Sequence, residues 1–293
     1  MEWQQFVMKL ESLDADLVEA ALLSNGALSV TLTDAGDDPV LEPAPGETPL
    51  WDDTRVTALF DGNANLDGLG AKLQADLGVT SLPPCHVETL ADRAWEREWL
   101  KDFQPMQFGE RLWVLPGDAP APGDPESVVV RLDPGLAFGT GTHATTALCL
   151  DWLASLDLNG ETVYDVGCGS GILGIAALKL GAADVLGVDI DLQAITATRQ
   201  NADRNGVADR LEASNDVTAP DRQFDVVLAN ILAGTLIDNA ERIGSAVRVG
   251  GRLALSGILA NQVADVRAAF CDRFEFDPPV TRDDWALLAG TRN

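Results

Sequence analysis

The stretch YDVGCGSGILG (residues 164–174) joins a short apolar strand to a helix through a turn rich in glycine. Its glycines fit the spacing G-x-G-x-G, through Gly167, Gly169 and Gly171. They also fit G-x-G-x-x-G, which ends at Gly174. Either spacing predicts a tight turn that points backbone N–H groups and the positive end of a helix dipole at a ligand. A strand, a glycine turn and a helix in this order indicate a Rossmann-like α/β sheet.

The charged residues around this turn favour one class of cofactor. Asp189 ends the next strand, about 20 residues after the glycine turn. An acidic residue at this distance binds the ribose hydroxyls of the cofactor, whichever glycine spacing applies. Asp165 precedes Gly167 by two residues, and no Lys or Arg occurs between residues 132 and 178. A pyrophosphate would meet Asp165 without a basic counter-charge, whereas an ammonium group would find a partner in it. We therefore predict S-adenosylmethionine rather than NAD, bound by Asp165, Gly167, Gly169, Gly171 and Asp189.

Short apolar strands alternate with helical segments from residue 143 onward, which predicts a parallel sheet covered on both faces. One of these helices is expected to run to about residue 247. The rhythm changes at the end, where FEFDPPV (274–280) and WALLAGTR (285–292) are separated only by TRDD. That link is too short for a crossover helix, so the two strands should pair antiparallel. The predicted fold class is α/β, a seven-strand sheet whose last pair is antiparallel.

The first 91 residues are predicted to form a separate domain. Their pattern gives strand, helix, strand, strand, helix, strand, with one helix in DADLVEAALLSNG (14–26), and this order is ferredoxin-like. Residues 92–106 are expected to form a linker helix, and residues 107–293 the cofactor domain. At the start of that domain, FGERLWVLPG (108–117) and ESVVVRLDPG (126–135) predict a hairpin around a proline-rich turn.

Acidic residues outnumber basic ones by far, with a formal net charge of −26 over 293 residues. Residues 1–60 hold 12 Asp and Glu but only Lys9 and Arg55 as basic residues. The repulsive field argues against direct binding of nucleic acid and favours a basic protein partner. Solubility, or a salty cytosol, is the alternative explanation of the charge.

The remaining composition excludes several classes of protein. The four cysteines contain no C-x-x-C pair and there are two histidines, so neither a disulfide framework nor a zinc site is expected. Cys168 lies inside the glycine turn, where a small residue is required, and its role is expected to be structural. No apolar run approaches the ~20 residues that span a bilayer, and the first residues lack a signal-peptide pattern. We expect a cytoplasmic monomer.

Asn230 is the candidate catalytic residue. It ends the strand DVVLAN (225–230), at the edge where α/β sheets bind ligands. An asparagine amide offers both an acceptor and a donor, so it can orient an amine through the N–H of that amine. The alternative is an Asx turn that caps the next helix.

The loop LDPGLAFGTGTHATT (132–146) is the second candidate element of the site. Its small and apolar residues lead into the cofactor domain, which suggests a flap over the methionine end of the cofactor. Phe138, Gly139 and Thr140 are its predicted cofactor contacts. His143 is a weaker catalytic candidate, as a general base, and capping of the following helix is the alternative.

Several motifs together resemble the methyltransferases of ribosomal protein L-eleven (L11), the PrmA family. The similarity extends over nearly the whole chain and includes the upstream stretches EPAPGETPLW and WEREWLKDFQPMQFGERLWV. The glycine turn alone is shared by many methyltransferases, whereas the stretches FGTGTH and NILA are far more specific. The motifs are LDPGLAFGTGTHATT, DVGCGSGILGIAALKLGA, GVDIDLQAI, NADRNGV, ANILAG and LSGIL.

The resemblance implies a class I methyltransferase domain and an N-terminal domain that captures the ribosomal protein. It implies repeated methylation of lysine ε-amines and of the N-terminal α-amine. By motif it assigns cofactor contacts to Thr146, Gly167, Asp189 and Asn230. An N-methyltransferase of a glutamine or of a small molecule is the alternative, but such enzymes carry Asn-Pro-Pro-Tyr where this chain has NILA. A nicotinamide oxidoreductase and a non-enzymatic binding module are the remaining alternatives.

Overall fold

The chain divides into two compact units, Met1–Trp95 and Glu96–Asn293. The predicted linker helix over 92–106 falls mostly outside the described residues. Inside them, Gln104 and Pro105 are not helical and Met106 already belongs to a strand. The computed structural model describes residues 2–35, 51, 53–91, 104–132 and 142–293.

The first unit has the element order βαββαβ that the sequence predicts, and its four strands form an antiparallel sheet in the order β2-β3-β1-β4. This is the ferredoxin-like arrangement. Asp14 caps α1 by accepting a hydrogen bond from the backbone N of Leu17 (3.1 Å), and Gly26 follows the helix at φ 98°. The elements are β1 (Glu2–Lys9), α1 (Ala15–Ser24), β2 (Ser29–Asp34), β3 (Thr54–Asp61), α2 (Leu69–Leu77) and β4 (Cys85–Ala91).

The second unit is built on a mixed sheet in the order β10-β9-β8-β11-β12-β15-β13, with β14 paired to β15. The strands from β10 to β12 are parallel, and β15 is antiparallel to both β12 and β13. The predicted α/β fold with an antiparallel final pair is therefore confirmed, but the described sheet has eight strands rather than the predicted seven. The strands are β8 (Thr162–Val166), β9 (Asp184–Val188), β10 (Leu211–Ser214), β11 (Phe224–Asn230), β12 (Val247–Leu259), β13 (Phe274–Phe276), β14 (Val280–Arg282) and β15 (Trp285–Arg292).

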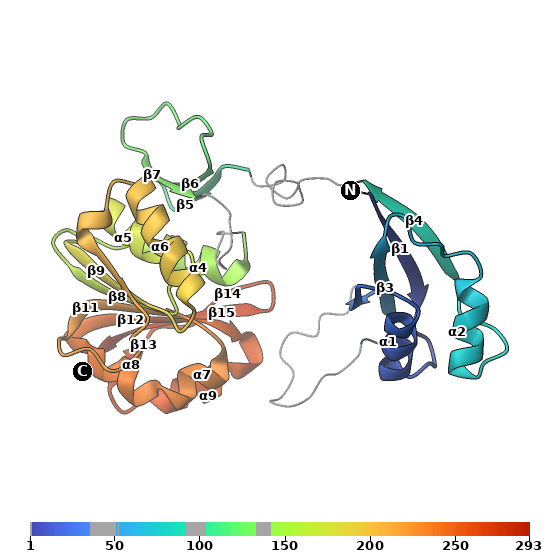
Figure 1. The fold of residues 1–293 in the computed structure, drawn as a ribbon. Coiled ribbons are helices and arrows are strands. Elements are labelled where there is room, and N and C mark those ends of the chain that lie inside the picture. Colours follow the sequence, from blue (N-terminus) through green and yellow to red (C-terminus); the bar gives the residue numbers. More distant parts are fainter. Residues whose placement is uncertain (1, 36–50, 52, 92–103, 133–141) are drawn as a thin grey trace. The chain divides into compact units, whose positions relative to one another are not determined.

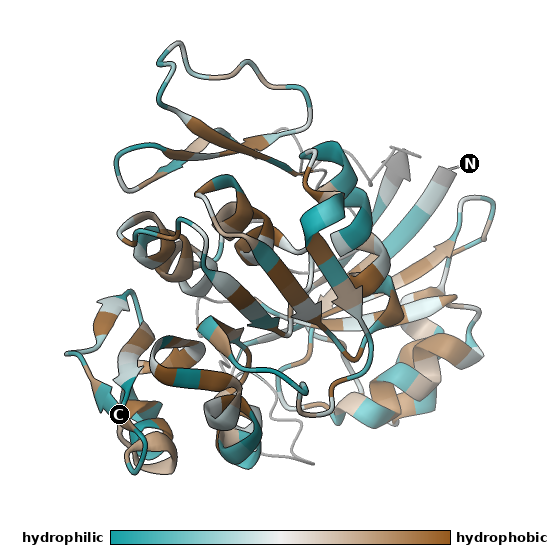
Figure 2. Ribbon diagram, turned by 90° about the vertical axis from the view of Figure 1, so that its left-hand side faces the viewer, coloured by the Kyte–Doolittle hydropathy of each residue, from teal (hydrophilic) through white to brown (hydrophobic). Residues whose placement is uncertain are grey.

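Helices cover both faces of this sheet, with α4, α5 and α6 on one side and α7, α8 and α9 on the other (Figure 1). The central strands carry mostly hydrophobic residues (Figure 2). In β11 the side chains alternate between the two cores, because Leu228 packs in the first and Val227 in the second. The helices are α4 (Ala144–Ala154), α5 (Ile172–Lys179), α6 (Leu192–Arg204), α7 (Ala233–Asp238), α8 (Ala240–Ala246) and α9 (Val263–Phe270).

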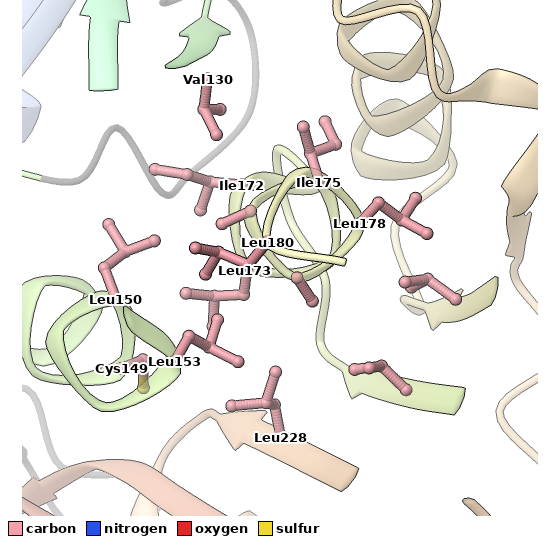
Figure 3. Packing of buried hydrophobic residues seen from close by; sticks show 14 of the residues in the cluster. Val130, Cys149, Leu150, Leu153, Ile172, Leu173, Ile175, Leu178, Leu180 and Leu228 are labelled. Atoms are coloured by element: carbon pink, nitrogen blue, oxygen red, sulfur yellow. The ribbon is translucent and has the colours of Figure 1, made fainter. Parts of the chain in front are cut away.

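The first core fixes α5, the helix that follows the glycine turn. Leu150 and Leu153 of α4 point toward α5, and Leu228 of β11 lies below them (Figure 3). All three leucines are fully buried. Since α5 begins directly after Gly171, this packing also fixes the turn between β8 and α5.

The predicted hairpin near the start of the second unit is wrong. The strands β6 (Leu112–Pro116) and β7 (Val128–Leu132) run parallel, and β6 forms its hairpin with β5 (Met106–Phe108) instead. The connection over 117–127 is long enough to return the chain to the start of β7. Val130 and Leu132 are thereby buried in the core that includes α4 and α5.

Two predicted elements are each divided in the structure. The segment 274–280 is not one strand, because Pro278 and Pro279 separate β13 from β14 and proline has no N–H for a ladder. The helix expected to reach about residue 247 is broken at Asn239, which ends α7 and begins α8.

Candidate functional site

The predicted site residues meet at the carboxyl ends of three neighbouring strands. In the register of the sheet, Val166 of β8 lies beside Val188 of β9 and Ala229 of β11. The residues that follow these three are Gly167, Asp189 and Asn230. The fold therefore places the glycine turn between Asp189 and Asn230, at the edge of the sheet where α/β proteins bind ligands.

The conformation of the turn follows the G-x-G-x-G spacing. Gly167, Gly169 and Gly171 have φ angles of 73°, 54° and 80°, a region that disfavours residues with a side chain. Gly174 instead lies inside α5, where a Cβ would come within 2.9 Å of Val185. The first three glycines thus shape the turn, and the fourth permits close packing of helix on strand.

Side chains from two other elements brace this turn. The carboxylate of Asp189 accepts a hydrogen bond from the backbone N of Gly169 (2.9 Å). Thr198 of α6 donates to the carbonyl oxygen of Gly169 (2.9 Å), and Asn201 donates to that of Ser170 (2.8 Å). Asp189 is half-buried, and its oxygens retain acceptor capacity for a ligand hydroxyl.

Asp165 lies deeper than the sequence interpretation assumed. It is only 1% exposed, and its Oδ2 accepts a hydrogen bond from the backbone N of Gly174 (3.1 Å). Its Oδ1 is buried and has no hydrogen-bond partner among the described residues. Burial, and to a lesser degree the negative charge of Asp189, raises the pKa of Asp165 to about 7. A positive group bound at the turn would favour the ionised form of this carboxyl.

These features fit the predicted cofactor. Neither Asp165 nor Asp189 forms an ion pair with Lys or Arg within the part of the chain that the structure describes. Oδ1 of Asp165 therefore has no counter-charge among the described residues, and a cationic amino-acid end could supply one. Among the described residues no cluster of His, Cys, Asp and Glu could hold a metal ion.

Cys168 has the structural role that was expected for it. Its side chain is 6% exposed and lies 3.5 Å from the hydroxyl of Thr198. Burial raises the pKa of the Cys168 thiol to about 12. The thiolate that a nucleophile requires is therefore not available at neutral pH.

Asn230 is oriented by a residue that is distant in sequence. Its Nδ2 donates a hydrogen bond to the hydroxyl of Thr146 in the first turn of α4 (3.3 Å). Thr146 is 3% exposed, whereas Asn230 is half-buried. The bond uses one of the two N–H donors of the amide, and Oδ1 has no hydrogen-bond partner among the described residues. The amide can therefore accept a hydrogen from an amine.

His143 adopts the capping role that the sequence left open as its alternative. It is the N-cap of α4, and its Nδ1 accepts a hydrogen bond from the backbone N of Thr145 (3.3 Å). The same nitrogen lies 2.8 Å from the hydroxyl of Thr145, and the ring packs edge-on against Trp285 with centroids 4.9 Å apart. Nδ1 is thus engaged in the helix cap, and the role of His143 as a general base stays a prediction.

We expect His143→Ala to lower the free energy of unfolding by about 1 kcal/mol, because it removes a helix cap. His143→Asn keeps a capping acceptor, so its free energy of unfolding and its kcat should both stay close to those of the parent. Urea titration and initial-rate assays on the two variants would measure this. Loss of kcat by about 100-fold in both variants would instead identify His143 as a general base.

Sequence reasoning missed three residues of this region. Ser256 of β12 is fully buried, and its hydroxyl lies within hydrogen-bond distance of the carbonyl oxygens of Thr145 and Ala286. Ile190 follows Asp189 directly and is 83% exposed, so it offers an apolar surface beside the carboxylate. Ile231 follows Asn230 and packs against the second core. Hydropathy patterns do not reveal such residues, because their surroundings come from distant segments.

Part of the predicted site lies outside the described residues. Phe138, Gly139 and Thr140 belong to the segment 133–141, which lies outside the described residues. They remain predictions. In the described part of the chain, no helix combines the length and apolar character that a membrane span requires.

Comparison with known proteins gives consistent matches over the full length of the chain. A family model described as "Ribosomal protein L11 methyltransferase (PrmA)" matches residues 2–293. Ribosomal protein L11 methyltransferase of Edwardsiella ictaluri is 51% identical over 291 residues, which cover 99% of each chain. The protein of the same name from Escherichia coli O81 is 50% identical over 294 residues, covering both chains fully.

A solved structure matches as well. The crystal structure of ribosomal protein L11 methylase from Lactobacillus delbrueckii subsp. bulgaricus has a TM-score of 0.59 and 34% sequence identity. The match covers 65% of this chain and 99% of that one.

Proposed function

This chain belongs to the family of ribosomal protein L11 methyltransferases, PrmA, and on that premise we propose that it methylates ribosomal protein L11 with S-adenosylmethionine as the donor. The acceptors in this proposal are lysine ε-amines and the N-terminal α-amine. The observation that carries the proposal is the placement of Asn230 beside the glycine turn. Thr146 holds its amide so that Oδ1 can accept from an amine. An amide acceptor next to a cofactor turn suits the orientation of a nitrogen nucleophile.

Three parts of the cofactor would each find a matching group among the described residues. The carboxylate of Asp189 would accept from the ribose hydroxyls, and the exposed side chain of Ile190 would cover one face of the adenine ring. The negative charge of Asp165 would stabilise the ammonium group from behind the glycine turn. Phe138, Gly139 and Thr140 are proposed to complete the site from the segment 133–141.

When bound, S-adenosylmethionine supplies a methyl group that is attached to a positively charged sulfur. A neutral amine accepts this methyl group as the sulfur–carbon bond breaks. The chain must therefore bind the amine in its neutral form. With a lysine pKa of ~10.4, deprotonation at pH 7 costs about 4.6 kcal/mol. An apolar pocket lowers that pKa, so proton loss to water suffices and the proposal includes no dedicated base. Asn230 contributes orientation.

The acidic first unit is proposed to bind the substrate protein. Its charge complements a basic ribosomal protein. We propose residues 1–91 as the recognition domain, 92–106 as the linker and 107–293 as the methyltransferase domain. A cytoplasmic monomer without direct contact to nucleic acid completes the proposal.

The assay that tests this function uses labelled S-adenosylmethionine and the mixed ribosomal proteins and RNA of cells that lack the enzyme. We expect the label in one small basic protein, and in methylated lysine after hydrolysis of that protein. Label confined to RNA, to glutamine or to a small molecule would contradict the proposal. Purified L11 with its lysines chemically acetylated is the matched control, and it should accept label only at a free N-terminus.

A further inference from the structure

The residue after Asn230 is held from three directions. The backbone N of Ile231 donates a hydrogen bond to the carbonyl oxygen of Ser256 on β12 (3.2 Å). Its side chain is half-buried and packs against the second hydrophobic core. The two remaining contacts involve glycines at positive φ from two different segments.

Gly257 of β12 makes room for the backbone of Ile231. A Cβ at Gly257 would lie 2.5 Å from the carbonyl oxygen of Ile231, 2.9 Å from its carbonyl carbon and 3.0 Å from its nitrogen. The first two distances are shorter than real Cβ contacts, and the third is a tight contact. Gly257 also has a φ of 78°. The peptide of Ile231 therefore lies directly on the backbone of β12, and only glycine permits this approach.

Gly167 makes room for the side chain of Ile231. A Cβ at Gly167 would overlap Cγ2 of Ile231, and the φ of Gly167 is 73°. The Cγ2 methyl thus occupies the space that the glycine turn leaves free at its first residue. Ile231 is in this way packed between the turn that follows β8 and the end of β12.

On the basis of the proposed function, we infer that Ile231 is a positioning residue. Its Cγ2 methyl fixes the position of Asn230 relative to the glycine turn. A branched Cβ restricts χ1, so Cγ2 of isoleucine stays in a fixed place. Asn230 shares the adjoining peptide bond and cannot shift unless Ile231 does. The amide that orients the amine is therefore held in place against the cofactor turn.

Two conservative variants separate this role from simple burial of apolar volume. Ile231→Val keeps Cγ2 and loses one methylene, whereas Ile231→Leu keeps the volume and loses Cγ2. Positioning by Cγ2 predicts kcat within about threefold of the parent for valine and at least about tenfold lower for leucine. The KM for S-adenosylmethionine should change by less than threefold in both. If only volume mattered, leucine would be the milder substitution.

A readout that does not depend on activity uses the side-chain amide of Asn230. The NMR resonances of its Nδ2 group can be assigned by their loss in Asn230→Asp. In samples without cofactor, these resonances should shift in Ile231→Leu and stay in place in Ile231→Val. Ile243→Leu is the matched control, because Ile243 is fully buried in the same core, on α8. It should leave both kcat and the amide resonances unchanged.

The two possible failures are distinguishable. A parent enzyme that transfers no methyl to L11 would contradict the proposed function, while the amide resonances would still test the role of Ile231. Unchanged resonances and unchanged kcat in Ile231→Leu would overturn the inference, as would equal shifts in the Ile243→Leu control.

Discussion

Replacement of Asn230 with alanine is expected to lower kcat by about 100-fold while the affinity for S-adenosylmethionine changes by less than threefold. The amide is held by Thr146 in the first turn of α4, and in the proposed role its Oδ1 orients the amine. Its loss leaves a bound amine free to rotate away from the reacting geometry, and misplacement by about 1 Å costs a factor of about 100. Single-turnover rates with L11 and calorimetric titration of the cofactor would measure the two quantities.

Asp189→Ala is the control that should show the opposite pattern. It removes the proposed acceptor for the ribose and releases the backbone N of Gly169, which donates a hydrogen bond to Asp189 in the parent. Cofactor affinity should therefore fall by at least about tenfold, with a smaller effect on the rate at saturating cofactor. Normal cofactor binding by Asp189→Ala would refute the ribose assignment. A fall in cofactor affinity equal to the fall in kcat in Asn230→Ala would refute the orienting role.

Asp165→Asn should weaken cofactor binding at least tenfold and also reduce the pH dependence of the free energy of unfolding. The pKa of Asp165 rises from 3.8 to about 7, mainly because the carboxyl is buried. Between these two pH values the unfolded chain is ionised at Asp165 while the folded chain holds a proton. The contribution of Asp165 to stability is therefore greatest at low pH and is lost as the pH rises toward 7.

Asp165→Asn has no carboxyl group at this position, so it does not lose this stability as the pH rises. The free energy of unfolding of Asp165→Asn relative to the parent should increase by about 2–3 kcal/mol between pH 5 and pH 8. Urea titrations of both proteins at the two pH values give this difference directly, and other titrating groups cancel in it. A difference that stays constant with pH would show that Asp165 is ionised in the folded protein throughout this range.

Cofactor titration supplies the second readout of the same substitution. The positive ligand favours ionised Asp165, so parent affinity should fall as the pH drops from 7.5 to 6, whereas the affinity of Asp165→Asn should stay flat over this interval. The negative charge of Asp189 also raises the pKa of Asp165, so Asp189→Asn serves as the comparison variant. Equal pH slopes in the parent and in Asp165→Asn would contradict a role of Asp165 in cofactor binding.

The sequence by itself determined the class of fold and the strand ends at which the candidate site residues lie. Glycines at 167, 169 and 171 require a turn with positive φ between strand and helix, and the structure has that turn. Apolar alternation, caps such as Asp14, and the short link before the last strand are local properties of the chain. They are readable because turn geometry and hydrophobic periodicity act over a few residues. Asn230 at the end of a strand followed from the same reasoning.

Only the tertiary structure decided what each of these residues contacts. Three features depend on segments that are distant in sequence. They are the parallel pairing of β6 with β7, the burial of Asp165 and the packing of Ile231 between two glycines. The bond from Asn230 to Thr146 spans 84 residues of chain. No local pattern encodes such contacts, because they arise when helices and strands pack to native density around a shared core and fix one register.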